Sequence, residues 1–505
     1  MISVKINDKE YQVEEGKTIL EVAKEIGIEI PHYCYHPALS IAGNCRMCLV
    51  EVKGMPKPMT ACSTRVSDGM EIYTDSELVK EARKGVLEFI LLDHPIDCPI
   101  CDKSGECKLQ DYYFEHSAQK SRYEFPKERH KVEKISKKIY LNPNRCVLCT
   151  RCVRFLREVT QTHELTTVER GSHTYIVCTD PESLDNNPFA SNISDLCPVG
   201  ALGLNEFRFK KRVWFTKKVK AICQGCSAGC NIYVDVSNRK QLLDGDDDEI
   251  VRIHTAENRK LGQYFICDEG RYSYKLYNDK EKRVKVPVLE GKEISVEEAL
   301  DVLKEKASVR KGVVILSPLH SVEENYAAYL FAKERGFDVF RPSSFRKELP
   351  EPALFIEEKK SPNDRMLKLM KLPKVSEIEE IDYDFALFLH NVGKVHSKSE
   401  VRILSVLKRA TFSVVFEPML SVFGESANMV IPAPIFVEEN GCYINEKNFI
   451  QRSNKALDYM YNAKPVWEYL GMDFKSEEEV FIRFAKEQLD KDLNYQKLGT
   501  EGFEL

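Results

Sequence analysis

The residues of this sequence that are best suited to chemistry are its cysteines. Seventeen are present among 505 residues, and fifteen of them fall into four groups of closely spaced thiols. Cys178 and Cys442 stand alone. Including His94, which precedes the second group, the candidate ligands are Cys34, Cys45, Cys48 and Cys62; His94, Cys98, Cys101 and Cys107; Cys146, Cys149, Cys152 and Cys197; and Cys223, Cys226, Cys230 and Cys267. Thiolate and imidazole ligands gathered this closely predict bound metal.

The composition argues against a secreted disulfide scaffold. Charged residues make up 30% of the chain, and the start MISVKINDKE has no basic-then-apolar export signal. No run of eighteen apolar residues occurs, so we expect a soluble protein of the cytoplasm. The net charge of -5 is small and implies no nucleic-acid partner. In such a compartment, grouped thiols indicate metal binding.

The second group offers three thiols and one imidazole in the spacing H-x3-C-x2-C-x5-C. Pro99 and Gly105 bend the backbone between the ligands. A histidine in a loop is more often a surface or core residue, but three thiols leave one position of a four-ligand centre open. We therefore predict that His94 is the fourth ligand. A neutral imidazole in place of a thiolate makes the site less negative and should raise its reduction potential.

The first group combines a central C-x2-C pair with distant thiols on both sides. Ala42, Gly43 and Asn44 precede the pair and leave backbone amides free to approach inorganic sulfide. Four cysteines in this pattern predict a [2Fe–2S] cluster. The alternative is zinc, although zinc sites more often use two C-x2-C pairs.

The third group begins as a bacterial ferredoxin motif, C-x2-C-x2-C, but Leu156 occupies the fourth position. Cys197-Pro198 has the form of the end of a second such motif, whose three earlier positions are Asn187, Ala190 and Ile193. In two-cluster ferredoxins each cluster takes its fourth thiol from the other motif. The surviving cysteines therefore make one complete [4Fe–4S] set. We expect Cys178 to be a buried structural residue.

The fourth group has the spacing C-x2-C-x3-C followed by the distant Cys267, and Gly225 and Gly229 permit a tight loop. Between the third and fourth thiols we expect a strand over 232–236 and a solvated hairpin end over 244–249.

Several elements must position these groups. Alternating apolar residues predict a hairpin over 2–13, and helical periodicity predicts helices over 18–26 and 74–90, the second with a capping box from Thr74 to Glu77. The basic stretch 116–140 is expected to be a solvated linker. Later, the pattern predicts strands over 284–288, 312–317 and 384–391, helices over 294–303 and 477–489, and a final polar tail that docks on a neighbour or is disordered.

These patterns resemble known cluster domains. The first group resembles plant-type ferredoxins, the second resembles the His/Cys3 domain shared by respiratory complex I and iron-only hydrogenases, and the fourth resembles the first domain of molybdopterin oxidoreductases. The resemblance implies a multidomain α+β and α/β chain. Its parts would be a β-grasp ferredoxin-like domain (1–78), a His/Cys3 domain (79–118), a bacterial-ferredoxin-like domain (140–212), a molybdopterin-oxidoreductase-type cluster domain (216–272) and a reduced α/β body (273–505).

Two departures from the molybdopterin family imply that the pterin cofactor is absent. The body is about 230 residues, short for a chain that encloses two pterins. The family usually has lysine two residues after the fourth thiol, where this chain has Glu269. The alternative is that residues 273–505 form an unrelated α/β domain.

Taken together, the four groups resemble the large iron–sulfur subunits of NADH:quinone oxidoreductase, the proton-translocating complex I. The resemblance implies one [2Fe–2S] and three [4Fe–4S] clusters, and a relay of electrons from a flavin- and NADH-binding subunit to a quinone-side iron–sulfur subunit. It implies the order [2Fe–2S], His/Cys3, third group, with the fourth cluster off the main line. The chain would be peripheral, on the cytoplasmic side of the membrane.

No Gly-rich dinucleotide fingerprint and no catalytic nucleophile or base is recognisable in the sequence. The alternatives are an iron–sulfur subunit of a formate dehydrogenase, one of an NAD-linked hydrogenase or diaphorase, and a zinc-stabilised interaction protein.

Overall fold

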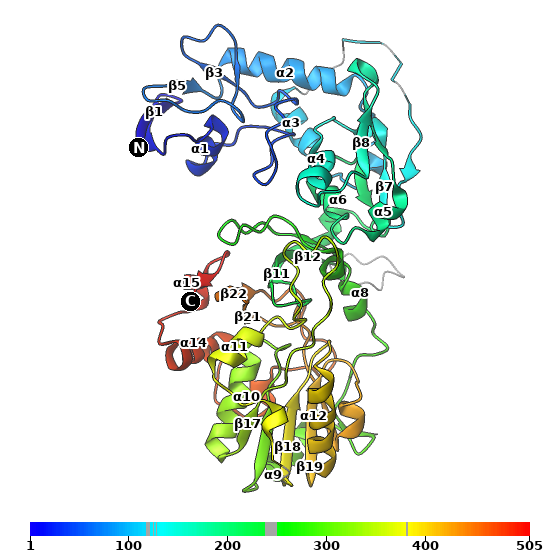
Figure 1. The fold of residues 1–505 in the computed structure, drawn as a ribbon, viewed down its shortest axis with the longest axis vertical. Helices are drawn as coiled ribbons and strands as arrows, with labels where there is room; N and C mark the ends of the chain where they lie inside the picture. Colours follow the sequence, from blue (N-terminus) through cyan, green and yellow to red (C-terminus); the bar gives the residue numbers. More distant parts are fainter. Residues whose placement is uncertain (118–121, 125, 128, 238–249, 380–381) are drawn as a thin grey trace. The chain divides into compact units, whose positions relative to one another are not determined.

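The computed structural model describes residues 1–505 except 118–121, 125, 128, 238–249 and 380–381 (Figure 1). The chain divides into two compact units, Met1–Phe215 and Thr216–Leu505. The expected hairpin end over 244–249 lies outside the described residues. Among the described residues, no helix is long and apolar enough to cross a membrane.

Unit 1 begins with a five-stranded mixed sheet in the order β2-β1-β5-β3-β4. The predicted hairpin is confirmed as β1 (Ile2–Ile6) and β2 (Lys9–Val13), and the predicted helix as α1 (Ile19–Glu25). Thr18 and Glu21 cap α1 reciprocally, which satisfies two of its free backbone amides. The apolar face of α1 shares a buried core with β1, Cys48 and Cys62. The remaining strands are β3 (Leu49–Val52), β4 (Met59–Thr60) and β5 (Glu71–Tyr73).

The helix that leads to the second group is α2 (Glu77–Leu91). Its N-cap is Ser76, whose hydroxyl accepts a hydrogen bond from the Val79 amide, so the predicted capping box at Thr74 is wrong. Thr74 instead donates its backbone N–H to Asn7 Oδ1 at 2.8 Å, because it directly follows β5, which pairs with β1. The short turn η1 (Cys98–Ile100) and helix α3 (Lys108–His116) complete this region.

The rest of unit 1 contains a three-stranded sheet in the order β10-β7-β6 and a two-stranded hairpin. The basic stretch 116–140 is not wholly a linker, since Ile139 and Tyr140 are buried in the central strand. Cys178 is only half-buried, which corrects the expectation of a buried residue. The bounds are β6 (Glu133–Lys134), β7 (Ile139–Leu141), α4 (Arg151–Glu158), β8 (Leu165–Val168), β9 (Tyr175–Cys178), α5 (Pro181–Asn186), α6 (Asn192–Leu196) and β10 (Leu202–Leu204).

Unit 2 opens with an antiparallel sheet of β11 (Thr216–Ile222), β12 (Asn231–Ser237) and β13 (Ile250–Thr255), which confirms the strand expected over 232–236. Two short helices follow it, α7 (Asp268–Arg271) and α8 (Tyr274–Tyr277).

The body of unit 2 is a seven-stranded sheet in the order β15-β14-β20-β19-β18-β16-β17 (Figure 1). Its strands β16 to β20 run parallel, and all of them except β17 are buried along their length. The apolar segments at 312–317 and 384–391 form β16 and β18, as predicted. The strand expected over 284–288 is wrong except at Val288, where the short strand β14 begins. The bounds are β14 (Val288–Leu289), β15 (Lys292–Glu293), α9 (Val296–Lys306), β16 (Gly312–Ile315), α10 (Val322–Arg335), β17 (Asp338–Phe340), α11 (Asp364–Leu369), β18 (Phe385–Leu389), α12 (Ser397–Arg409), β19 (Phe412–Glu417) and β20 (Met429–Pro432).

The C-terminal segment is folded rather than a loose tail. The predicted helix over 477–489 is α14 (Glu477–Leu489), and Tyr495 and Leu498 beyond it are buried. The last strand, β23 (Phe503–Glu504), pairs with β22 (Phe449–Ser453), which also pairs with β21 (Gly441–Ile444). Helices α13 (Val466–Tyr469) and α15 (Tyr495–Leu498) complete the chain.

Candidate iron–sulfur centres

The first group lies in the loop between α1 and β3 and just after β4. Its four thiols are close enough to hydrogen-bond one another, and Cys34, Cys48 and Cys62 are buried. Hydrogen bonds from Cys45 and Cys62 lower the pKa of Cys34 far below its ordinary value. The backbone amides of Asn44 and Cys45 also point at the Cys34 sulfur. The small residues before the C-x2-C pair therefore bring backbone amides to the thiols.

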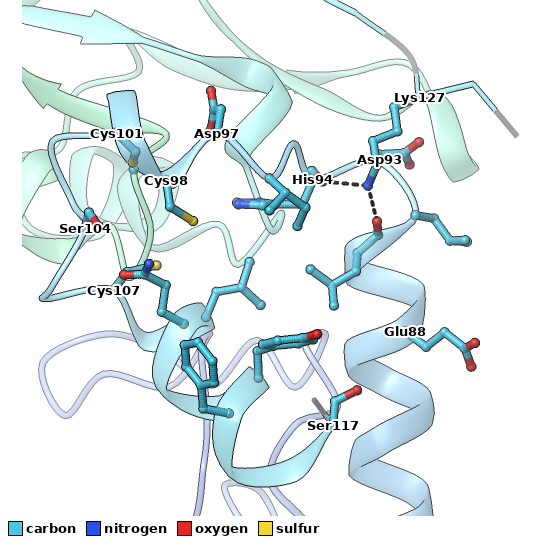
Figure 2. A pocket seen from close by; sticks show the side chains of 18 of the residues that line it. Glu88, Asp93, His94, Asp97, Cys98, Cys101, Ser104, Cys107, Ser117 and Lys127 are labelled. Atoms are coloured by element: carbon cyan, nitrogen blue, oxygen red, sulfur yellow. Dashed lines mark hydrogen bonds between the residues drawn. The ribbon is translucent and has the colours of Figure 1, made fainter. Parts of the chain in front are cut away.

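The second group lines a cavity of about 750 Å³. Figure 2 shows Cys98, Cys101 and Cys107 on one side of this cavity and the imidazole of His94 reaching towards them. The Nδ1 atom of His94 is buried and has no hydrogen-bond partner among the described residues. The ring also hydrogen-bonds the Arg145 backbone, which is how ligand histidines are usually oriented. A buried ring nitrogen without a hydrogen-bond partner can give its lone pair to a metal, so its position fits a metal ligand.

Burial keeps the His94 imidazole neutral, because it lowers the pKa to about 4. The loop around the ring is held by two cations. Lys127 donates to the His94 carbonyl at 2.7 Å, and Arg145 pairs with Asp97 at 2.6 Å. A neutral ring is the form in which histidine binds a metal.

Gly200 completes the wall of this cavity from the third group's part of the chain. A Cβ atom at this position would lie 2.2 Å from the Cys101 sulfur. This residue was not among those predicted from the sequence, where its only signal was its place three residues after Cys197. The site therefore requires glycine where the two ligand groups meet.

The four thiols of the third group line one small cavity, together with apolar residues such as Leu141 and Ile176. Leu148 and Thr150 have positive φ angles of 49° and 57°, which turn the loop around the cavity. Burial raises the pKa of Cys149 to about 11. At the three positions where the second motif lacks its cysteines, Asn187, Ala190 and Ile193 are buried in the protein core.

The fourth group lies at the ends of β11 and β12 and at the start of α7, and its four thiols also line one cavity. Gly270 approaches so closely that a Cβ atom there would lie 2.8 Å from the Cys223 sulfur. Glu269 lies at the rim of the cavity and pairs with Lys360 at 3.1 Å and Lys347 at 3.3 Å. A lysine therefore does line this cavity, although a different part of the chain supplies it.

The donor sets fit clusters better than single ions. No three His, Cys, Asp or Glu side chains of the described part of the chain converge on one metal ion. In three of the groups the four ligands are instead distributed around a shared cavity. A cluster is wider than an ion and takes its protein ligands on different irons. Cys178 and Cys442 line none of these cavities.

Four family models match the chain in the order of its ligand groups. They are a 2Fe-2S iron-sulfur cluster binding domain (1–77), the NADH-ubiquinone oxidoreductase-G iron-sulfur binding region (83–122), the ferredoxin-like domain of NADH-quinone oxidoreductase subunit 3 (136–203) and the molybdopterin oxidoreductase Fe4S4 domain (216–279). These matches indicate a [2Fe–2S] cluster and [4Fe–4S] clusters.

The chain is also similar to curated proteins. It is 36% identical to the G subunit of the NADH-quinone oxidoreductase of Rickettsia conorii over 356 residues, which is 69% of this chain and 51% of that protein. It is 41% identical to the NADH-ubiquinone oxidoreductase 75 kDa subunit of Reclinomonas americana over 274 residues, 54% of this chain and 38% of the relative. The chain thus spans about half the length, or less, of the relatives it matches.

Among solved structures, a chain of an NAD+-reducing [NiFe]-hydrogenase in the H2-reduced state is 29% identical, with a TM-score of 0.38. The match covers 42% of this chain and 91% of that chain.

Proposed function

We propose that this chain, a homologue of the large iron–sulfur subunits of NADH-quinone oxidoreductase, is an electron-transfer subunit in the peripheral arm of that enzyme. It would receive electrons from a flavin- and NADH-binding subunit and pass them to a quinone-side iron–sulfur subunit. The assembled complex would hold it on the cytoplasmic side of the membrane, where the whole enzyme translocates protons.

The proposal assigns one cluster to each ligand group, within the domain bounds predicted from the sequence. The first group would hold a [2Fe–2S] cluster, and the other three, including the one with His94, would each hold a [4Fe–4S] cluster. When bound, these clusters supply one-electron redox chemistry. The polypeptide supplies the ligands, buries them and fixes the distance from one group to the next. No molybdopterin is expected in unit 2.

The observation that carries the proposal is that the third group contacts both other groups of unit 1. On one side, Asn44 Nδ2 donates to the Leu148 carbonyl at 2.9 Å, and Ser40 Oγ donates to Glu158 at 2.7 Å. On the other side, Lys108 N donates to the Pro198 carbonyl at 3.1 Å, and Gly200 touches Cys101.

The first and second groups also approach each other, since Tyr112 Oη accepts from the His32 backbone N–H at 3.1 Å, but Tyr112 lies five residues beyond Cys107. The contacts of the third group are made by residues next to its ligands, and they favour a different order from the one that the sequence suggested. The third group would stand between the [2Fe–2S] group and the His94 group. The His94 group would then be the exit from this chain. Its open cavity supports this role, because the exposed side chains of Ile96 and Phe114 surround it at 72% and 74% exposure.

Metal analysis tests the cluster assignment. The purified chain should contain about fourteen iron atoms, acid-labile sulfide, and neither zinc nor molybdenum. Zinc in place of iron would favour an interaction protein, and molybdenum or tungsten would favour a formate dehydrogenase subunit.

Turnover in the complex tests the relay. Cys149→Ser should abolish NADH:quinone activity, because it breaks the middle of the proposed path. Cys226→Ser should remove one EPR signal and leave most of the activity, because the fourth group is off that path. Equal losses in the two variants, with both proteins assembled, would overturn this arrangement.

A further inference from the structure

Arg154 is a buried cation that lies between the first and third ligand groups. It is on α4, two residues after Cys152, and only 4% of its surface is exposed. Its Nη2 atom donates to the Cys34 carbonyl at 2.5 Å and to the Cys149 carbonyl at 3.2 Å. Its Nη1 atom donates to the Ser40 carbonyl, and its Nε atom to the Thr150 hydroxyl. One side chain thus bonds a ligand residue of each group.

Nothing in this bonding pattern neutralises the arginine. Among the described residues, its hydrogen bonds go to carbonyl and hydroxyl oxygens and none to a carboxylate. A buried guanidinium stays charged at neutral pH, and an uncompensated buried charge is costly. Burial lowers the pKa of Arg154, whereas negative charge at Cys149, Cys34 or Glu158 raises it. We therefore expect the anionic ligand groups on its two sides to balance the charge of Arg154.

A second arginine repeats the bridge one helical turn earlier. Arg151 donates to the Tyr35 carbonyl at 2.5 Å and to the Leu196 carbonyl at 3.3 Å. Tyr35 follows Cys34, and Leu196 precedes Cys197, so this contact also joins one group to the other.

We infer that Arg154 is a positioning residue shared by the first and third groups, whose fixed charge raises the reduction potential of both centres together. The inference rests on the proposed function, because it requires clusters at both groups. A positive charge in a poorly screened interior stabilises an added electron on either side of it. Because the same charge raises both reduction potentials, the difference in potential between these neighbouring centres of the relay is preserved.

The test is an EPR-monitored redox titration of the purified chain with its clusters. Arg154→Met should lower the midpoint potentials of both centres, whereas Arg154→Lys, which keeps the charge, should leave both near the wild-type values. Glu158→Gln removes a nearby negative charge and should raise both. The matched control is Lys9→Met, since this exposed cation lies on the edge strand β2 and should shift neither potential.

The outcomes separate this inference from the proposed function. A wild-type chain without iron and sulfide would overturn both. With the clusters present, a shift at one centre only, a shift at neither, or equal shifts in Arg154→Met and Arg154→Lys would overturn the inference alone. If Arg154→Met does not assemble its clusters, Arg154→Gln decides, because its side chain is also uncharged but keeps a hydrogen-bond donor. Unchanged potentials at both centres in that variant contradict the shared charge.

Discussion

The two units hold their ligand groups in different ways. Unit 1 places three groups in loops around three small sheets, and the groups contact one another through hydrogen bonds such as that from Asn44 to Leu148. Unit 2 holds a single group at one end of a three-stranded sheet, beside a large α/β body that brings Lys347 and Lys360 to it. Unit 1 therefore brings three ligand groups into contact, as the proposed relay requires, whereas unit 2 is organised around one group.

The largest expected effects come from adding a methyl group at the glycine that lies against a cysteine sulfur in each unit. Gly200→Ala should remove the EPR signal of the His94 centre and stop turnover, because the new Cβ would lie 2.2 Å from the Cys101 sulfur, which the proposed cluster would hold in place. Gly270→Ala, at 2.8 Å from Cys223, should remove the signal of the fourth centre and leave turnover. Gly85→Ala, with nothing within 4 Å, is the control. Intact signals in both variants would contradict the required close packing.

The next effect is a dependence of stability on pH that we expect in unit 2. In unit 2, burial raises the pKa of Glu323 to about 7 and that of Glu324 to about 8. Because these folded-state values lie above the ordinary 4.5, the stability that the protonated carboxyls give is complete below pH 4.5 and is lost as the pH rises through 7 and 8. Each pKa unit corresponds to about 1.4 kcal/mol, so Glu324→Gln should stabilise unit 2 by about 2–4 kcal/mol at pH 8.

Tryptophan fluorescence can follow this change, since Trp214 lies in unit 1 and Trp467 in unit 2. Unfolding of a Trp214→Phe background at pH 5 and pH 8 should show the difference between Glu324 and Gln only at the higher pH. A gain of the same size at pH 5 would point to packing rather than titration. Glu297→Gln, on exposed helix surface, is the control.

A smaller effect is expected from replacing His94, the predicted imidazole ligand in unit 1. His94→Cys should keep a cluster at the second group and lower its potential, because a thiolate replaces a neutral ring. The measurement is a redox titration of that signal, with the fourth centre, which already has four thiols, as the comparison. An unchanged signal would remove His94 from the ligand set.

The smallest effect tests the helix that leads to His94. Ser76→Ala should destabilise unit 1 by about 1 kcal/mol, because it removes the N-cap of α2. Thr74→Ala should cost less at this helix, since Thr74 is not its cap. Urea unfolding followed by Trp214 fluorescence in a Trp467→Phe background measures both. A larger loss from Thr74→Ala would restore the capping box that the sequence predicted.

Much of the local structure could be predicted because its causes are close together in the chain. The hairpin at 2–13, the helices at 18–26 and 477–489 and the strand at 232–236 follow from residue periodicity alone. The predictions were wrong where contacts between residues far apart in the sequence determine the local structure. Thr74 bonds Asn7 instead of capping α2, and Ile139 and Tyr140 enter a sheet that Leu202–Leu204 completes.

The sequence by itself determined which thiols form a group, since a cluster loop is encoded in short spacings such as that from Cys146 to Cys152. Only the tertiary structure decided which groups are neighbours, because that depends on contacts between segments more than a hundred residues apart, as between Cys34 and Arg154. Gly200 beside Cys101 and Lys360 beside Glu269 are likewise contacts across more than ninety residues of sequence. Ligand identity is thus a local property of this chain, whereas the path between the ligands is a property of its fold.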